Sequence, residues 1–205
     1  MSGAIKVKKT IHDVAKPGYL LIGAGGHAQA VVEAANLLIG EVKLYIDPRP
    51  SSWLNADRVE SDEATLDINL PIVMGIGGAN AKQLKQRNIL LKTFVSKGHK
   101  APPIVHPTAH VSCSAQIGLG AIVLAGAIVQ PGVKIGQGVI INSKALIEHD
   151  CIIDEGAHVA PGAIILGGSN IGSNSMVGAS SVVLPQCKVD ADTLIPALTR
   201  FSESK

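Results

Sequence analysis

The second half of the chain carries a hydrophobic pattern with a period of six residues. From Val105 to Ile195 every sixth position is valine or isoleucine, and the residue four positions after each of them is usually small. A fixed hexapeptide period is typical of a parallel β-helix, in which each repeat is one short strand and a turn. With three hexapeptides in each triangular coil, the pattern predicts a prism of about five coils around an aliphatic core.

The first half of the chain alternates between strand and helix patterns. An apolar run from Tyr19 to Ile22 leads into GAGGHA, a helical pattern extends to about Ile39, and Val42 to Ile46 predicts a second strand. The sequences LPIVMGIG and GANAKQLKQRNILL predict a third strand and a second helix. Because strands and helices alternate, we expect a parallel sheet in an α/β unit.

Prolines in the sequence HKAPPIVHP separate these two patterns. We therefore predict a leader at residues 1–17, a Rossmann-like mononucleotide-binding domain at 18–103 and a β-helix domain at 104–205.

Composition and charge narrow the possible functions. Aromatic residues make up only 2% of a chain that is 46% hydrophobic, which suits the flat, repetitive packing of small aliphatic side chains. The formal net charge is +2 and no basic cluster is interleaved with aromatic residues, which argues against a nucleic-acid surface. No apolar run is long enough to cross a bilayer, and the first residues lack the apolar core of a secretory signal, so we expect a cytoplasmic protein without membrane insertion.

The three cysteines are predicted to be structural thiols. Cys113, Cys151 and Cys187 show no CxxC spacing, and an odd number argues against a closed disulfide framework. Cys151 and Cys187 occupy the small, inward position of the hexapeptide repeat.

The glycine turn after the first predicted strand is a candidate phosphate site. Glycines at positions 23, 25 and 26 would let a phosphate approach the free N–H groups at the start of the following helix. Asp47 follows at a spacing at which an acid meets a ribose in dinucleotide folds. The unit is long enough for only one mononucleotide-binding half, which favours a nucleoside diphosphate over NAD, although a tight turn without a ligand would have the same residues.

The two halves together resemble the bacterial nucleotide-sugar N-acetyltransferases and sialic-acid O-acetyltransferases (NeuD/PglD-like). The resemblance rests on GAGGHA in the first half and on IIN, IEHD, AHVAPGA and GG in the second. It implies a left-handed β-helix, a homotrimer with intersubunit active sites, acetyl-CoA as co-substrate and a first domain that binds a UDP-sugar. The sequence IDPRP replaces the acidic pair usual in the family, so dTDP- and GDP-sugars stay open.

The resemblance also implies which residues bind the sugar nucleotide. The nucleotide would be held by Gly25, Gly26, His27 and Asp47. The sugar would lie near Asn142 and Glu148.

The catalytic and coenzyme residues follow from the same resemblance. His149 would be the general base, and Asp150 would be the acid that orients it. His158 would contact the acetyl group, and the Gly167 N–H would stabilise the oxyanion. Backbone atoms of Ala179 and Ala197 would line the coenzyme A groove, and no metal is expected.

The repeat itself places the two histidines. His149 is two residues past the inward Ile147 and His158 is five past the inward Ile153, so both are expected at outward or corner positions. Nine residues are half of an eighteen-residue coil, so the two side chains should lie on opposite sides of one prism. In a threefold assembly, His149 of one chain could face His158 of the next. An imidazole that titrates near neutral pH can take the proton from an amine that attacks a thioester.

Three other functions fit parts of the sequence. O-acetylation of sialic acid or a related sugar would use the same base on a hydroxyl group. A metal-dependent carbonic anhydrase on a β-helix would need three histidine ligands with a close pair, and a third partner is missing. A scaffold or sensor that has lost the chemistry would not need to retain EHD, AHV and Gly167. The sequence therefore predicts an acetyl-CoA-dependent acetyltransferase acting on a UDP-4-amino-4,6-dideoxy sugar for surface glycan or glycoprotein biosynthesis.

Overall fold

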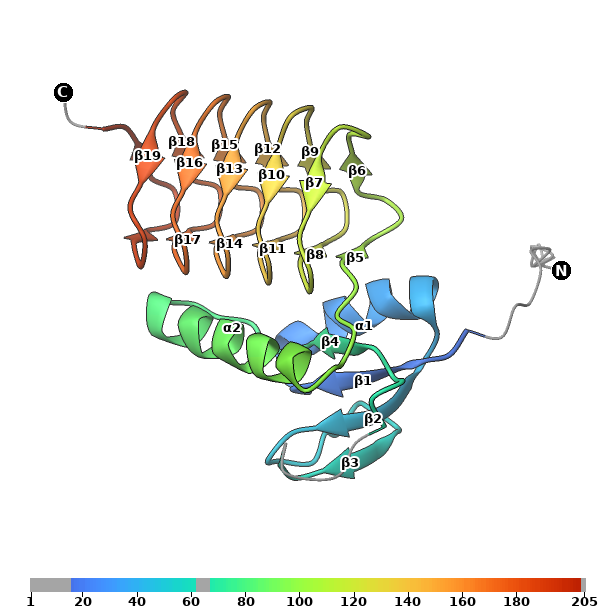
Figure 1. The fold of residues 1–205 in the computed structure, drawn as a ribbon. Coiled ribbons are helices and arrows are strands. Elements are labelled where there is room, and N and C mark those ends of the chain that lie inside the picture. The colour runs from blue at the N-terminus through green and yellow to red at the C-terminus, as the bar shows by residue number, and fades with distance from the viewer. Residues whose placement is uncertain (1–15, 62–66, 204–205) are drawn as a thin grey trace, which may run out of the picture.

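The fold combines a small α/β unit with a parallel β-helix (Figure 1). The structure is a computed structural model that describes residues 16–61 and 67–203. Most of the leader predicted at residues 1–17 lies outside the described residues.

The α/β unit contains one parallel sheet and two helices. The sheet has the order β3-β2-β1-β4. Its strands are β1 (Tyr19–Ile22), β2 (Val42–Ile46), β3 (Asp57–Val59) and β4 (Ile72–Met74). The helices are α1 (Gly26–Ile39) and α2 (Ala81–Ser96). The expected strands and helices are present, and β3 is an additional strand in a segment where the hydrophobic pattern predicted none.

The β-helix is a triangular prism with three parallel sheets, which we call its first, second and third faces. The first face consists of β5 (Ile104–Val105), β8 (Ile122–Val123), β11 (Ile140–Ile141), β14 (His158–Val159), β17 (Met176–Val177) and β20 (Leu194–Ile195). The second face consists of β6 (His110–Val111), β9 (Ile128–Val129), β12 (Leu146–Ile147), β15 (Ile164–Ile165), β18 (Val182–Val183) and β21 (Arg200–Phe201). The third face consists of β7 (Gln116–Ile117), β10 (Lys134–Ile135), β13 (Ile152–Ile153), β16 (Asn170–Ile171) and β19 (Lys188–Val189).

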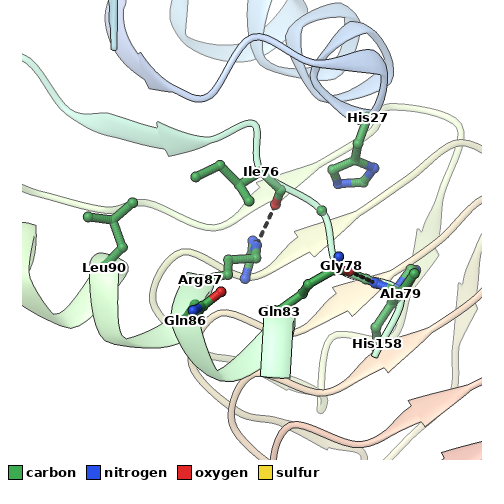
Figure 2. A pocket seen from close by; sticks show the side chains of 10 residues that line it. His27, Ile76, Gly78, Ala79, Gln83, Gln86, Arg87, Leu90 and His158 are labelled. Atoms are coloured by element: carbon green, nitrogen blue, oxygen red, sulfur yellow. Dashed lines mark hydrogen bonds between the residues drawn. The ribbon is translucent and has the colours of Figure 1, made fainter. Parts of the chain in front are cut away.

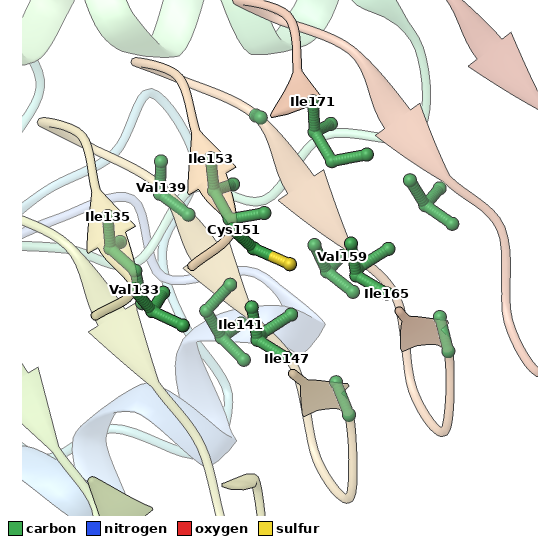
Figure 3. Packing of buried hydrophobic residues seen from close by; sticks show 14 of the residues in the cluster. Val133, Ile135, Val139, Ile141, Ile147, Cys151, Ile153, Val159, Ile165 and Ile171 are labelled. Atoms are coloured by element: carbon green, nitrogen blue, oxygen red, sulfur yellow. The ribbon is translucent and has the colours of Figure 1, made fainter. Parts of the chain in front are cut away.

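The predicted hexapeptide core is confirmed. The second residue of each strand points inward, and the small residue before the strand fills the corner of the coil, as Figure 3 shows for the middle coils. Cys151 and Cys187 are buried among these aliphatic side chains, whereas Cys113 is exposed. Where serine takes the small position, its hydroxyl group is satisfied, since Ser169 Oγ donates to the Leu184 carbonyl oxygen at 2.8 Å.

Helix α2 attaches the α/β unit to the prism. The two helices cover opposite faces of the sheet, since α1 packs with Tyr19 and Leu21 and α2 packs on the side of Leu20 and Ile22, and the β4 edge of the sheet lies toward the prism (Figure 1). Helix α2 packs along the corner formed by Gly120, Gly138 and Gly156. A Cβ atom at Gly120 would lie 2.8 Å from Leu91, so this corner needs glycine for the close approach as well as for its positive φ. Leu91 is fully buried in this contact, which contributes about 1.5–3 kcal/mol.

Neither helix in the described part of the chain combines the length and hydropathy that a bilayer crossing requires.

Candidate active site

A histidine and an aspartate form a pair at the corner that follows β12. His149 Nδ1 lies 2.9 Å from Asp150 Oδ2, and the two side chains are 64% and 74% exposed. Asp150 has a φ of 60°, in the left-handed region that asparagine and aspartate tolerate better than most residues. Because an ionised carboxylate only accepts hydrogen bonds, Nδ1 carries the proton in the neutral imidazole. Nε2 of His149 is therefore left as the basic nitrogen.

The imidazole ring of His149 lies over Gly167, one coil further along the prism. A Cβ atom at Gly167 would be 2.7 Å from Nε2, so only a glycine leaves room for the ring. The Gly167 N–H makes no hydrogen bond among the described residues, whereas the next N–H, that of Gly168, donates to the His149 carbonyl oxygen at 2.9 Å. Nε2 of His149 and the free N–H of Gly167 thus lie at one corner of the prism. Half-buried Glu148 is the first residue of this corner, directly after β12.

The second predicted histidine, His158, lies elsewhere. It projects from β14 on the first face, outside the aliphatic core of the prism, yet it is only 7% exposed because the loop before α2 covers it. Nδ1 lies 2.8 Å from the Gly78 carbonyl oxygen, and Nε2 lies 3.0 Å from Asn142 Nδ2. Since a carbonyl group only accepts, Nδ1–H donates to Gly78 and Nε2 accepts from the amide of Asn142. The sequence placed this side chain outward but gave no sign that the α/β unit covers it.

The orientation of the Asn142 amide is fixed by its other end. Its Oδ1 accepts a hydrogen bond from Ser143 N at 2.8 Å, which leaves Nδ2 to donate to His158. Burial is the main cause that lowers the pKa of His158; the hydrogen bond to Gly78 acts against it, and the charge of nearby Arg87 lowers the pKa further. His158 is therefore neutral near pH 7, with both ring nitrogens engaged.

A cavity of about 550 Å³ opens between the α/β unit and the prism beside His158 (Figure 2). It is lined by His27, the loop from Ile76 to Ala79, the α2 residues Gln83, Gln86, Arg87 and Leu90, and His158. No acidic side chain is among these residues. The side chain of His27 has a buried Nε2 without a hydrogen-bond partner among the described residues. Burial first, and then the charges of Arg87 and His158, lower the pKa of His27 to about 4.

Arg87 joins the cavity wall to the β-helix. This side chain is almost fully buried, its Nε donates to the Ile76 carbonyl oxygen at 2.7 Å, and its Nη1 donates to the carbonyl oxygen of Gly138 in the prism. Its Nη2 is buried without a partner among the described residues. Burial lowers the pKa of Arg87 to about 10, so the guanidinium group is still charged at neutral pH. The cavity wall therefore carries a positive charge.

A second cavity, of about 320 Å³, lies at the N-terminus of α1. The N-cap residue Gly25 provides no side-chain cap, and a Cβ atom at Gly25 or Gly26 would meet nothing within 4 Å, so the first helical turn is open. Asp47 forms the opposite wall, where Oδ2 accepts from Ala24 N and Oδ1 accepts from Arg49 N, both at 2.9 Å. Trp53 closes this loop by donating from Nε1 to the Ala24 carbonyl oxygen at 3.0 Å.

The predicted site residues of the β-helix thus fall into two groups within one chain, apart from Gly25, Gly26, His27 and Asp47 in the α/β unit. His149, Asp150 and Gly167 share the corner between the second and third faces, whereas Asn142 and His158 lie by the corner between the first and second faces. Ala179 and Ala197 continue this second corner in later coils, where Leu198 N donates to the Ala179 carbonyl oxygen. The outward residues of the second face separate the two corners, and several of them are aliphatic: Ile128, Leu146, Ile164 and Val182.

Sequence reasoning missed Arg87, Gly78 and Trp53. Arg87 lies in the buried stripe of α2 with Leu84 and Leu91, at helical spacing, so a cation within an apolar stripe was a signal for it. Trp53 is the only tryptophan of a chain poor in aromatic residues, which was a weaker signal. Nothing local in the sequence indicated the contact between Gly78 and His158.

Metal-ligand geometry is absent from the described residues, in which no three His, Cys, Asp or Glu side chains come together as a metal site would require.

Comparison with known proteins identifies the class of this fold and site. Residues 132–167 match the family model for the bacterial transferase hexapeptide (six repeats). The acetyltransferase domain of PglB from Neisseria gonorrhoeae FA1090 is 32% identical, with a TM-score of 0.79 and 88% of each chain covered. A structure of the same domain in complex with acetyl coenzyme A is 31% identical, with a TM-score of 0.78 and the same coverage. No curated protein matches the chain.

A second relative is a mutant of GDP-perosamine N-acetyl transferase from Caulobacter crescentus, in complex with CoA and GDP-perosamine. It is 28% identical, with a TM-score of 0.79, and the match covers 89% of this chain and 87% of that one. The fold and these matches define a hexapeptide-repeat transferase with a left-handed β-helix. Within that class, the chain belongs to the family of left-handed β-helix sugar acetyltransferases.

Proposed function

We propose that this protein transfers the acetyl group of acetyl-CoA to the amino group of a nucleotide-linked amino sugar, with His149 as the general base, for surface glycan or glycoprotein biosynthesis. The observation that carries the proposal is the pair formed by His149 and Asp150, with its free Nε2 next to the free Gly167 N–H. Acetyl coenzyme A and GDP-perosamine in the structures of relatives support the two substrate classes. A UDP-4-amino-4,6-dideoxy sugar is the proposed acceptor, with GDP and dTDP sugars as the alternatives to test.

The chemistry follows from the atoms at this corner. The sugar amine attacks the thioester carbon, an N–C bond forms, and the C–S bond breaks so that coenzyme A leaves as a thiolate. Nε2 of His149 takes the proton that the amine loses and passes it to the thiolate. Asp150 keeps the Nδ1 proton in place and stabilises the imidazolium, as an aspartate does in a hydrolase triad. The Gly167 N–H would stabilise the developing oxyanion, a contribution of about 3 kcal/mol when such donors are well placed.

The two cavities of the α/β unit suit the two ends of a sugar nucleotide. The open N-terminus of α1 offers unpaired N–H groups to a diphosphate at Gly26 and His27. The cavity next to Asp47 would take the nucleoside, and the cavity between His27 and His158 would take the sugar. The positive charge of Arg87 in the cavity between His27 and His158 favours a substrate with negative charge nearby. On this basis we propose residues 18–103 as the nucleotide-sugar-binding domain and residues 104–205 as the acetyltransferase domain.

The separation of the two corners favours an active site shared between chains. The aliphatic residues of the second face form a stripe, and Ile128 within it is 38% exposed in the single chain. If this face turns toward a threefold axis, the His149 corner of one chain approaches the Asn142 corner of the next. We therefore propose a homotrimer with intersubunit active sites. The coenzyme would lie in the groove between prisms, along Ala179 and Ala197.

Thiol release from acetyl-CoA tests the proposed reaction. The purified protein is assayed against UDP-, dTDP- and GDP-linked 4-amino-4,6-dideoxy sugars and against sialic acid. His149→Ala is compared with Gln116→Ala, which removes an exposed side chain of the third face, away from the face proposed for the trimer contact. We expect turnover with one amino sugar, a loss of about 10²–10⁴-fold in kcat for His149→Ala, and no loss for the control. Turnover with sialic acid alone would instead establish O-acetylation.

A further inference from the structure

The carboxylate of Asp150 has very little to hold it. Its side chain is 74% exposed, and its only hydrogen bond among the described residues is the one that Oδ2 accepts from His149 Nδ1–H. The backbone before the side chain is held in place, because Asp150 N donates to the Pro131 carbonyl oxygen at 3.1 Å and the His149 carbonyl oxygen accepts from Gly168 N at 2.9 Å. The orientation of the carboxylate must therefore depend on the shape of the surface around it.

Gly132, one coil earlier, shapes that surface. It occupies the same left-handed turn position as Asp150, with a φ of +76°, and a Cβ atom built on it would lie 2.4 Å from Asp150 Oδ1. That distance is far shorter than van der Waals contact, whereas the distance to Asp150 N is 3.5 Å, an ordinary contact. An added methyl group would therefore displace the carboxylate and leave the backbone in place. Turning the carboxylate moves Oδ2 away from His149 Nδ1.

We propose that Gly132 is a positioning residue for acetyl transfer: the space left by its missing side chain holds the Asp150 carboxylate in the orientation that binds His149 Nδ1. This inference rests on the proposed role of His149 as the base. Gly132 leaves space for the Asp150 carboxylate from the coil before, and Gly167 leaves space for the His149 ring from the coil after.

The test compares Gly132→Ala with Gly126→Ala. Gly126 has a similar φ of +67°, but the nearest atom to its added Cβ is Lys144 Cγ at 3.5 Å, so this control carries the same backbone strain without a clash. Two quantities are measured on the full chain: kcat in the thiol-release assay, and the tautomer of His149 from its ring ¹⁵N chemical shifts. We expect Gly132→Ala to lower kcat about 10- to 100-fold, as Asp150→Ala does, and to shift His149 away from the Nδ1–H tautomer. Gly126→Ala should keep the wild-type kcat and the wild-type tautomer.

A double variant shows whether Gly132 acts through Asp150. Gly132→Ala combined with Asp150→Ala should lose no more activity than Asp150→Ala alone, because the clashing oxygen is gone. If Gly132→Ala folds poorly, this double variant should recover the Tm of Gly126→Ala. The proposal would be overturned if Gly132→Ala had the same kcat and His149 tautomer as Gly126→Ala. It would also be overturned if the activity losses of Gly132→Ala and Asp150→Ala were fully additive in the double variant, or if the double variant stayed unfolded.

The failure of the base assignment would look different. If Gly132→Ala and Asp150→Ala both change the His149 tautomer but leave kcat intact, the positioning role of Gly132 stands and His149 is not the base.

Discussion

His158 Nδ1 lies 2.8 Å from the carbonyl oxygen of Gly78, so a side chain of the β-helix is hydrogen bonded to a loop of the α/β unit eighty residues away in the sequence. The same imidazole accepts a hydrogen bond from Asn142 on the next corner of the prism. This one residue therefore connects the proposed sugar cavity to the face of the prism that the coenzyme would approach.

Removing this connection should cost stability as well as activity. His158→Ala leaves the Gly78 carbonyl group and the Asn142 amide without a partner in a buried place, and we expect a loss of about 1–3 kcal/mol in the free energy of unfolding. The KM for the sugar nucleotide should rise because the loop at Gly78 loses its anchor. Urea unfolding and initial rates measure the two effects. Gln116→Ala, at an exposed position of the third face, should stay within about 0.5 kcal/mol of the wild type.

Two contacts between α2 and the prism should differ sharply in their contribution. In Arg87→Lys the single ammonium group cannot bond the carbonyl oxygens of Ile76 and Gly138 at the same time, because it lacks the planar, forked donors of a guanidinium group. We expect a loss of about 2–4 kcal/mol in the free energy of unfolding. Lys92→Gln removes the ion pair with Glu155, 2.7 Å long but half exposed, and should cost less than about 1 kcal/mol. Equal losses in thermal unfolding of the two variants would show that Arg87 is not an anchor of this contact.

The partly buried imidazole of His27, with its buried Nε2, should make the protein sensitive to acid. Its folded-state pKa of about 4 lies below the ordinary value of 6.5, so the unfolded chain binds the proton more readily. The contribution of His27 to the free energy of unfolding is therefore fully present above about pH 6.5. It declines by about 3 kcal/mol as the pH falls toward 4. His158, whose pKa is also lowered, contributes in the same direction. Unfolding free energies at pH 7 and pH 4 should differ less in His27→Gln than in the wild type; an unchanged difference would contradict this role for His27.

Gly167→Ala tests the site from the other side of the imidazole. The added Cβ would lie 2.7 Å from Nε2 of His149, and since the φ of Gly167 is not positive, alanine brings no backbone strain. We expect the ring to be displaced, with a loss of kcat of about 10- to 100-fold and an almost unchanged Tm. Wild-type kcat in this variant would mean that the ring position over Gly167 is not the catalytic one.

The sequence predicted the β-helix well because its determinant is local and repeated. Each inward residue such as Ile147 or Ile153 is specified by its own hexapeptide, and the corner position of His149 follows from counting. The sequence was less informative where structure depends on distant contacts. Strand β3 has only three residues and little apolar character, and it forms because β2 lies beside it. The burial of His158 depends on a loop that arrives from the other unit.

The central claim is that His149 of one chain acts on a sugar held by the nucleotide site of the next chain. Mixing two inactive variants tests it most directly: His149→Ala keeps the nucleotide site, and Asp47→Arg keeps His149 but blocks the cavity at the N-terminus of α1. The two variants are unfolded and refolded together in equal amounts. If trimers then assemble at random, about a quarter of the interfaces combine an intact His149 from one chain with an intact nucleotide site from the next. The account predicts acetyl transfer near a quarter of the wild-type rate. A mixture as inactive as either variant alone, in trimers shown to contain both chains, would contradict it.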